Sequence, residues 1–426
     1  MKIRRRWHAV ERFVISGGKN LRGTVKISGS KNAALPILAA SLLCAGQCTI
    51  KDVPNLQDIS TICDVLTSLG GVIRRNGTTV TVDAGHVYLA EVEEELTRQM
   101  RASNLVLGAL VGRFHQAKIS RPGGCNIGSR PMDLHLKGLR ALGVQVNERF
   151  GFITAHTDRL AGVEMHLDLP SVGATENIMM AAVLAEGNTV IRNAAKEPEI
   201  VDLQNFLNCL GAKVKGAGTD TIKIEGVNGL HSGEYQIIPD RIEAGTYMIA
   251  TAITAGDVTV ANVIPEHMDA LTAKLRESGV KVEEGDDYLR VVGTGRLQAV
   301  DIKTMPYPGF PTDLQPQMMA LLTLAGGTSV ITETVFEHRY KHVSELRRMG
   351  AEIKVEGQTA IIKGVRKLSG APVEVTDLRA GAALVLAAMA AENGTIVECV
   401  EHIDRGYERL EQKCNTLGAH IVRIKS

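Results

Sequence analysis

The feature that most constrains this chain is a helix-ending glycine that returns about every 70 residues. Helix ends of the Leu-x-x-Leu-Gly type recur along the whole sequence, and successive glycines are 73, 68, 68, 71 and 68 residues apart. The six are Gly70, Gly143, Gly211, Gly279, Gly350 and Gly418. Glycine is favoured at such a position because the backbone there turns left-handed. The constant period indicates an internal repeat.

Each copy of the repeat has the same order of elements. The glycine is followed by an alternating strand, as at residues 352–355, and in four copies a turn leads to a second strand, as at 221–224, which is typical of a hairpin. An alanine-rich helix precedes a second set of markers that lead into short strands. These are Gly46, Gly187, Gly256, Gly327 and Gly394, with Arg113-Phe114 in this position of the second copy.

Six such units predict an α/β fold of two lobes. Units of about 70 residues are too long for a solenoid and too short for independent domains, and 426 residues suit two or three domains at about 100–200 residues each. We expect three units per lobe, with helices inside and sheets outside. Residues 383–391 are apolar on every side, which fits a fully buried helix.

Composition excludes several classes of protein. The net charge is +1, from 48 basic and 47 acidic residues, so a general nucleic-acid binder is disfavoured. No apolar stretch approaches the roughly 20 residues that span a bilayer, and no signal-peptide core follows the basic N-terminus. The seven cysteines have irregular spacing and no CxxC pair, which argues against disulfides and structural zinc. We therefore expect a cytoplasmic protein with no metal and no membrane partner.

The inner helices are predicted to begin with polar or charged residues. The starts lie near residues 30–32, 101–104, 171–175, 240–241, 311–313 and 377–379. A cation at a helix start opposes the helix dipole and needs an anionic partner. Lys31, Arg101, Arg241 and Arg379 all occupy such positions. If these helices run parallel, their N-termini converge between the lobes on a site for phosphates or carboxylates.

The same polar residues also fit a purely structural role. Ser171, Thr175, Asp240 and Asp313 are good helix N-caps, each worth about 1 kcal/mol. Residues 402–409, His-Ile-Asp-Arg-Gly-Tyr-Glu-Arg, follow a strand and open the last helix. They fit either a salt-bridged helix start on the surface or a part of the site.

Cys125 stands apart from the other cysteines because it lies between glycines in a predicted loop, residues 122–135. A cysteine in such a loop does not pack in a core. Arg121, Arg130 and His135 favour its thiolate form, as expected of a reactive nucleophile or acid. The other six cysteines lie in helix or strand patterns and are expected to be buried.

These segments are similar to the UDP-N-acetylglucosamine 1-carboxyvinyltransferase family. The similar segments are Ser-Gly-Ser-Lys-Asn-Ala-Ala-Leu-Pro at 28–36, Arg-Ala-Ser at 101–103, Gly-Gly-Cys at 123–125, Ser-Val-Gly-Ala-Thr at 171–175, Phe-Pro-Thr-Asp at 310–313 and residues 402–408. The resemblance runs from about residue 13 to the C-terminus. It implies a two-lobed inside-out α/β barrel whose chain crosses between lobes twice. Residues 31–238 would form the first lobe, and residues 1–30 and 239–426 the second.

The resemblance also implies an activity. Members transfer the enolpyruvyl group of phosphoenolpyruvate to the 3-hydroxyl of UDP-N-acetylglucosamine and release phosphate, at the first committed step of peptidoglycan synthesis, without a cofactor. It makes Cys125 the general acid and fosfomycin target, Asp313 the base and Lys31 a catalytic cation. Further phosphoenolpyruvate contacts would be Asn32, Arg101, Arg379 and Arg405. Further sugar-nucleotide contacts would be Arg130, Pro131, Met132, Asp133, Leu134, Ser171, Val172, Gly173 and Val335.

One departure and three alternatives accompany this resemblance. Leu169-Pro170 stand where some members carry a lysine, so only backbone amides are expected to meet the nucleotide phosphates there. A transferase acting on shikimate 3-phosphate shares the architecture but does not use the Gly-Gly-Cys loop. A non-catalytic nucleotide-sugar binder would bind without releasing phosphate. An RNA-end-processing enzyme is disfavoured by the neutral charge. Oligomeric state is not predicted.

Overall fold

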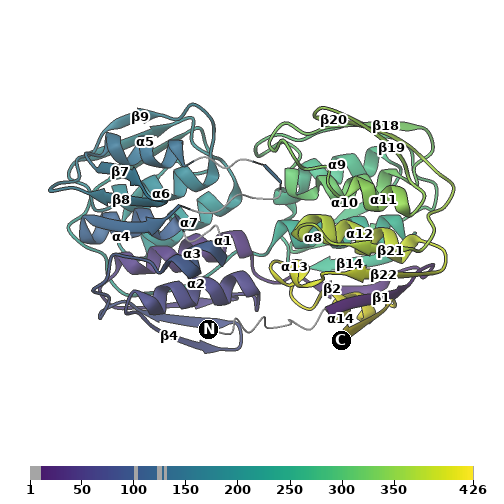
Figure 1. Ribbon diagram of the computed structural model, residues 1–426, viewed down its shortest axis with the longest axis horizontal. Coiled ribbons are helices and arrows are strands. Elements are labelled where there is room, and N and C mark those ends of the chain that lie inside the picture. The colour runs from purple at the N-terminus through teal and green to yellow at the C-terminus, as the bar shows by residue number, and fades with distance from the viewer. Residues whose placement is uncertain (1–10, 100–103, 122–126, 129–131, 426) are drawn as a thin grey trace.

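A computed structural model of the chain describes residues 11–99, 104–121, 127–128 and 132–425 (Figure 1). Two lobes lie side by side in this view, the first coloured purple to teal and the second green to yellow. The N-terminal strands, β1 (Glu11–Ser16) and β2 (Arg22–Lys26), lie with the second lobe. The architecture is the predicted one of α/β lobes with helices inside and sheets outside.

The described strands of the first lobe form three sheets, with strand orders β13-β3-β5-β4, β6-β8-β7 and β11-β12-β10-β9. The strands are β3 (Gln47–Lys51), β4 (Val72–Asn76), β5 (Thr79–Asp83), β6 (Gln116–Ser120), β7 (Gln145–Arg149), β8 (Phe152–His156), β9 (Glu164–His166), β10 (Asn188–Arg192), β11 (Lys213–Lys215), β12 (Thr221–Glu225) and β13 (Gly233–Gln236). Alternation sets their faces, because every second residue points inward. In β5, for example, Val80 and Val82 are buried opposite Ile50 and Cys48 of β3.

The described strands of the second lobe repeat this arrangement in the orders β15-β16-β14-β2, β17-β18-β20-β19 and β21-β22-β1-β23. The remaining strands are β14 (Asp257–Ala261), β15 (Lys281–Glu284), β16 (Tyr288–Val292), β17 (Ile302–Lys303), β18 (Thr328–Thr332), β19 (Glu352–Glu356), β20 (Thr359–Lys363), β21 (Pro372–Glu374), β22 (Gly394–Glu398) and β23 (His420–Lys425). The predicted hairpins are confirmed, as for β19 with β20 and β11 with β12.

Buried helices fill the centre of each lobe. They are α1 (Lys31–Ala40), α4 (Val106–Phe114) and α6 (Val172–Ala182) in the first lobe, and α8 (Arg241–Ile253), α10 (Gln315–Leu322) and α12 (Leu378–Ala390) in the second. α12 is buried from Arg379 to Met389, as its apolar sequence predicts. The other helices are α2 (Gln57–Ser68), α3 (Glu94–Gln99), α5 (Asp133–Ala141), α7 (Pro198–Cys209), α9 (Asp269–Glu277), α11 (Val343–Arg348), α13 (Glu401–Asp404) and α14 (Leu410–Thr416). Short 3-10 turns are η1 (Ser41–Leu43), η3 (Pro265–Met268) and η4 (Thr312–Leu314).

The six periodic glycines have the backbone that the repeat predicts. All six have φ between 90° and 102°, in the left-handed region where a side chain is strained. The second copy differs at the other marker, because α4 continues through Arg113 and Phe114 and His115 takes the left-handed turn with φ of 57°. The residues 402–409 also lie differently than expected. They span α13 and the turn before α14 instead of opening the last helix.

The chain crosses between the lobes at two places. β2 pairs in parallel with β14 of the second lobe, whereas the next helix, α1, belongs to the core of the first. β13 pairs in parallel with β3 of the first lobe, whereas α8 belongs to the core of the second. One buried core draws on residues 34–237, and the other on 13–27 and 242–421. Among the described residues, no helix combines the length and apolarity that a membrane crossing requires.

Candidate functional site

The starts of α1 and α8 meet where the lobes adjoin. Asp240 caps α8, and its Oδ1 accepts hydrogen bonds from two amides of the first turn at 2.8 and 2.9 Å. Its other oxygen accepts from the backbone N–H of Lys31, the first residue of α1, at 3.2 Å. One buried carboxylate therefore joins the N-termini of two helices from opposite lobes, as predicted for the inner helices.

A buried aspartate pairs with two cations at this junction. The Nζ of Lys31 lies 3.1 Å from Asp58 Oδ2, and the Nε of Arg405 lies 3.0 Å from Asp58 Oδ1. Lys31 and Asp58 belong to the first lobe, and Arg405 follows α13 in the second. Burial raises the pKa of Asp58, but Lys31 and Arg405 outweigh it, so the pKa lies below its ordinary value of 3.8. The cluster thus carries two positive charges and one negative charge.

Asp313 forms a second charged cluster, in η4 at the start of α10. Its Oδ1 accepts from Arg339 Nη2 at 2.8 Å, and its Oδ2 accepts from Arg379 Nη2 at 3.0 Å and Nε at 3.2 Å. Both guanidinium groups are almost fully buried, whereas 27% of the Asp313 side chain is exposed. The arginines therefore fix a carboxylate that still faces solvent. Asp313 is not at the helix cap position that the sequence allowed, because it lies inside η4 and α10 begins only after Leu314.

Arg379 packs against Tyr407, which is itself hydrogen-bonded to buried polar side chains. Its guanidinium lies 5.3 Å from the centre of the Tyr407 ring. The Tyr407 hydroxyl is 2.9 Å from Thr246 Oγ1 and accepts from Gln317 Nε2 at 3.1 Å. Tyr407 belongs to the 402–409 motif, and both of its partners lie on inner helices. This motif is therefore built into the junction and is not only a salt-bridged surface turn.

The start of α6 offers free backbone amides in the first lobe. Ser171 caps the helix, its hydroxyl accepting from the Ala174 N–H at 3.4 Å, and Val172 and Gly173 follow. A Cβ on Gly173 would lie 3.0 Å from His135 Cε1, so the close contact favours glycine. Amides at a helix N-terminus attract anions. Thr175 does not cap the helix, because its hydroxyl instead accepts from the Ala195 N–H at 3.2 Å.

His135 is a neutral residue and not the cation that the sequence suggested. Burial lowers the pKa of His135 to about 4. Its Nδ1 lies 3.1 Å from Asn177 Nδ2, which also donates to the Gly173 carbonyl, so the imidazole accepts this hydrogen bond. An uncharged imidazole gives little support to a thiolate. Cys125 itself lies outside the described residues, so the prediction that His135 favours its thiolate stays a prediction.

The cysteine loop borders the second lobe. Arg101, Cys125, Arg130 and Pro131 lie outside the described residues. Ile127 follows the loop cysteine by two residues, and its carbonyl accepts from the His338 N–H at 3.0 Å. A Cβ on Gly128 would lie 2.3 Å from Glu337 Oε2, which shows how closely the two segments approach. The edge of the loop thus contacts the segment that follows β18.

The other predicted contact residues lie around these clusters with different degrees of exposure. Asn32 is half-buried on α1, Met132 is buried, Asp133 is exposed at the start of α5, Leu134 is half-buried, and Val335 is 40% exposed. Of the six cysteines expected to be buried, Cys44, Cys48 and Cys414 are buried and Cys63 and Cys399 are half-buried. Cys209 is exposed, because it ends α7 at the surface.

Arg241 finds its anion in the opposite lobe. Its Nε lies 3.1 Å from Glu199 Oε1 and its Nη2 lies 3.3 Å from Glu199 Oε2, and both side chains are largely buried. Lys31, Arg241 and Arg379 thus confirm that a cation at a helix start needs an anion. In each case a carboxylate of the protein supplies it.

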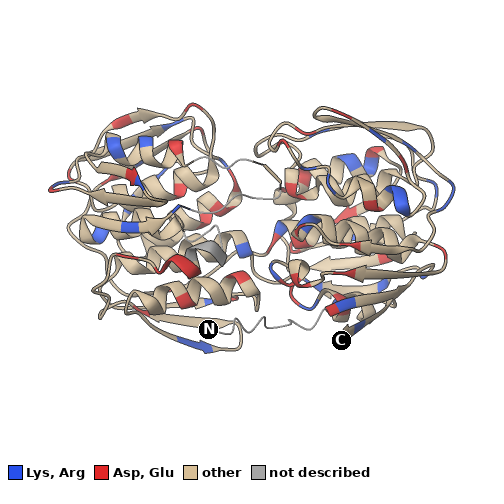
Figure 2. Ribbon diagram, viewed as in Figure 1, with Lys and Arg blue, Asp and Glu red and all other residues tan. Residues whose placement is uncertain are grey.

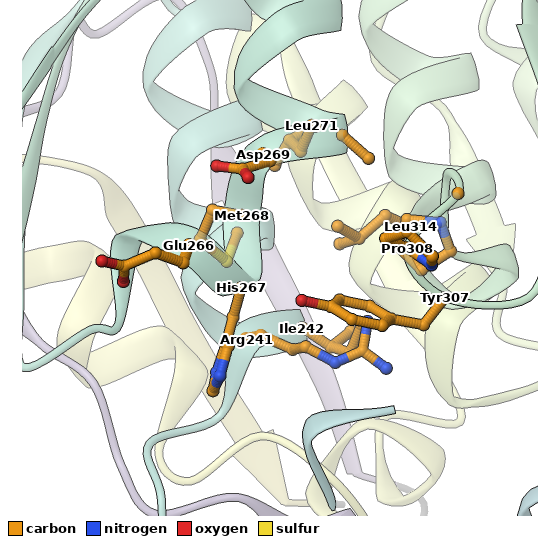
Figure 3. A pocket seen from close by; sticks show the side chains of 13 residues that line it. Arg241, Ile242, Glu266, His267, Met268, Asp269, Leu271, Tyr307, Pro308 and Leu314 are labelled. Carbon is orange, nitrogen blue, oxygen red and sulfur yellow. The ribbon is translucent and has the colours of Figure 1, made fainter. Parts of the chain in front are cut away.

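A small cavity of about 40 Å³ lies beside this pair in the second lobe (Figure 3). Arg241, His267 and Tyr307 line it, and the Arg241 guanidinium lies 5.6 Å from the centre of the Tyr307 ring. Of the described residues that the family resemblance assigned to substrate, none lines this cavity. Lys31, Arg405 and Arg379, which the resemblance assigned to phosphoenolpyruvate, lie instead in the clusters around Asp58 and Asp313.

Figure 2 shows acidic and basic residues dispersed over both lobes. Within the part of the chain that is described, no group of three or more His, Cys, Asp or Glu residues is placed to hold a metal ion.

Sequence reasoning missed Asp58, Arg339 and Glu333, although all three hold predicted site residues. Asp58 looks like an ordinary acid in the first turn of a helix, and Arg339 like a surface residue near one. The partners of Asp58 and Arg339 are distant in sequence, so no local spacing reveals them.

Comparison with known proteins gives one consistent family. The family model described as EPSP synthase (3-phosphoshikimate 1-carboxyvinyltransferase) matches residues 15–414. The chain is 56% identical to UDP-N-acetylglucosamine 1-carboxyvinyltransferase 1 of Carboxydothermus hydrogenoformans, over 97% of this chain and 99% of the relative. It is also 56% identical to the protein of the same name from Symbiobacterium thermophilum, over 97% and 95%.

Solved structures agree on the fold. The enolpyruvyl transferase NikO from Streptomyces tendae is 26% identical, with a TM-score of 0.89 over 98% of this chain and all of that one. EPSP synthase from Acinetobacter baumannii is 18% identical, with a TM-score of 0.76 over the same shares, and this likeness concerns the fold alone.

Proposed function

The chain belongs to the EPSP synthase family of carboxyvinyltransferases, and on that premise we propose that it transfers the enolpyruvyl group of phosphoenolpyruvate to the 3-hydroxyl of UDP-N-acetylglucosamine, releasing phosphate. The observation that carries the proposal is the meeting of Lys31 and Arg405, cations from opposite lobes, on the buried Asp58. We propose residues 31–238 as the bounds of the first lobe, and residues 1–30 with 239–426 as those of the second.

The reaction is an addition followed by an elimination. A proton adds to the methylene carbon of phosphoenolpyruvate while the sugar oxygen bonds to C2 and loses its own proton, giving a tetrahedral phosphoketal. A proton then leaves the new methyl group and the C2–O bond to phosphate breaks, which restores the double bond. The step needs an acid, a base and a positive pocket.

Residues of both lobes supply these roles in the proposal. Cys125 is the acid, and Asp313 is the base that takes the hydroxyl proton. Arg339 and Arg379 orient the Asp313 carboxylate while it faces solvent. Lys31 and Arg405 bind the carboxylate and phosphate of phosphoenolpyruvate, helped by Asn32, Arg101 and Arg130. Because opposite charges in a site with little water attract strongly, closing the lobes strengthens this binding.

The start of α6 binds the diphosphate of the sugar nucleotide. Ser171, Val172 and Gly173 offer amides there, and Leu169-Pro170 add no charge, so the helix N-terminus carries this contact alone. Pro131, Met132, Asp133, Leu134 and Val335 line the rest of the nucleotide site. We place the enzyme in the cytoplasm, in peptidoglycan synthesis and hence in cell-wall growth and division, with Cys125 alkylated by fosfomycin.

Product analysis tests this proposal. The protein is incubated with phosphoenolpyruvate and UDP-N-acetylglucosamine, and mass spectrometry identifies the nucleotide products. We expect a carboxyvinyl ether of the sugar nucleotide and an equal amount of phosphate from wild type. Cys125→Ala should form almost none while still binding the nucleotide sugar. Unchanged turnover by Cys125→Ala would remove the cysteine from the mechanism.

A further inference from the structure

Glu333 is a fully buried carboxylate that neither the repeat pattern nor the family resemblance singles out. It follows β18 directly and has no exposed surface. Its Oε1 accepts from the Thr304 hydroxyl at 2.8 Å and from the N–H groups of Val335 and Phe336 at 2.8 and 3.2 Å. Its Oε2 accepts from the Thr312 hydroxyl at 2.9 Å. In the described chain, no basic side chain forms an ion pair with it.

These four donors join two segments that the proposed reaction uses. Thr312 precedes Asp313, the proposed base. Val335 is a proposed nucleotide contact, and the residues after it meet the edge of the cysteine loop, where His338 N–H donates to the Ile127 carbonyl. Glu333 therefore lies between the base on one side and the nucleotide and loop contacts on the other.

A second hydrogen-bonded link joins the same two segments. Arg339, at the far end of the same segment, donates to Asp313 Oδ1 at 2.8 Å. The segment 335–339 is thus held to residues 312–313 at both ends, through Glu333 at one and Arg339 at the other. A frame fixed at two points allows the segment little movement relative to Asp313, whereas a single link would leave it free to rotate.

We propose that Glu333 is a positioning residue that sets the distance between Asp313 and the segment 335–338, and so aligns the sugar hydroxyl with its base. This inference rests on the proposed function. Position and not charge is what matters, because the donors are hydroxyls and amides. A displacement of about 1 Å at a reacting group can lower a rate about 100-fold.

Three substitutions separate position from charge. Glu333→Gln keeps the length and one acceptor oxygen, and its amide can donate to the Thr312 hydroxyl, which accepts as well as donates. Glu333→Asp keeps the charge but withdraws the oxygens by one methylene group. Glu333→Met keeps the volume and leaves the Val335 and Phe336 amides without an acceptor. We expect Glu333→Gln to retain most of the wild-type kcat.

Glu333→Asp and Glu333→Met should lower kcat about 100-fold and raise the KM for UDP-N-acetylglucosamine, while phosphoenolpyruvate binding changes little. Glu345→Met is the control, because Glu345 is a buried carboxylate of the same lobe that accepts from the Glu374 N–H and pairs with Arg348, and neither partner belongs to the proposed site. It should lower the melting temperature without changing either KM.

The inference is overturned if Glu333→Asp keeps activity and Glu333→Gln loses it, or if the Glu333 variants only lose stability as Glu345→Met does. If Glu333→Met fails to fold, the comparison of Glu333→Gln with Glu333→Asp still separates position from charge. Wild type is measured in parallel. A wild-type protein without phosphate release dependent on UDP-N-acetylglucosamine would overturn the proposed function and this inference together, whereas an active wild type whose variants match it would overturn the inference alone.

Discussion

Asp58 binds a cation with each of its oxygens, and water scarcely reaches it. Removing one member of a buried charge cluster leaves the others uncompensated, which typically costs about 3–5 kcal/mol. Arg405 is partly exposed and Lys31 is not, so the lower end of this range applies here. Asp58 therefore stabilises the junction before any substrate anion arrives.

Asp58→Asn should lower the free energy of unfolding by about 3 kcal/mol at neutral pH. The native pKa lies below 3.8, so the stabilisation is complete above the unfolded pKa and is lost as the pH falls through the native pKa. Urea unfolding at several pH values should show a constant difference in the free energy of unfolding between wild type and variant above pH 3.8. This difference should narrow below pH 3.8. A difference that does not narrow in acid would show that the ionised carboxylate is not the cause.

Residue chemistry was predictable from sequence only where it is local. The cations at helix starts indicated that anions lie nearby, because a cation there opposes the dipole of its own helix. Their partners were not predictable, since Arg241 and Glu199 are 42 residues apart and Arg379 and Asp313 are 66 apart. The charge of His135 was not predictable, because sequence does not show burial and burial lowers its pKa.

At the scale of elements, Asn177 joins three helices of the first lobe. From α6, its Nδ2 contacts His135 of α5, and its Oδ1 accepts from the Gly108 N–H of α4 at 2.6 Å. The side chain makes hydrogen bonds to buried polar groups that would otherwise be unpaired. Each buried polar group left unpaired would cost about 1–3 kcal/mol of stability. This arrangement holds the start of α6, where the diphosphate is proposed to bind.

The neutral His135 makes this helix contact sensitive to acid. Its pKa is about 4 in the fold against 6.5 in the unfolded chain, so the unfolded state binds more protons between these values. Stability should be complete above pH 6.5 and should fall by on the order of 3 kcal/mol as the pH drops to 4. His135→Gln should flatten that part of the stability profile measured by thermal unfolding. An equally steep profile in the variant would refute the assignment.

Elements were more predictable than contacts. The glycine period located six helix ends, and the predicted starts of α1, α6, α8 and α12 lie within a residue or two of the observed ones, because capping residues and turn glycines act locally. The start of α10 differs, since η4 precedes it. The second-copy helix ends at His115, where no glycine marks the turn.

At the scale of the whole molecule, the two lobes are joined by buried charge as well as by two chain crossings. Arg241 and Glu199 form the clearest such pair, with two hydrogen bonds between the lobes. Three units per lobe followed from the repeat, but the docking of the lobes did not, because the repeat is the same within each lobe and the joining residues are not periodic.

A double-mutant cycle tests this junction. Arg241→Leu and Glu199→Leu should each destabilise the protein by about 3 kcal/mol, because each leaves a buried charge unpaired. The double variant should be less destabilised than the sum of the two, since neither member of the pair is then left without the other. Melting temperatures give the comparison. Strict additivity would mean that the two side chains do not interact across the lobes.

The most direct test of the whole account is steady-state phosphate release from phosphoenolpyruvate with UDP-N-acetylglucosamine or shikimate 3-phosphate as the acceptor. The account predicts release that depends on UDP-N-acetylglucosamine and is absent with shikimate 3-phosphate. Release only with shikimate 3-phosphate would keep the fold and overturn the substrate. Binding of the nucleotide sugar without release in either case would contradict the transferase and leave a binding protein.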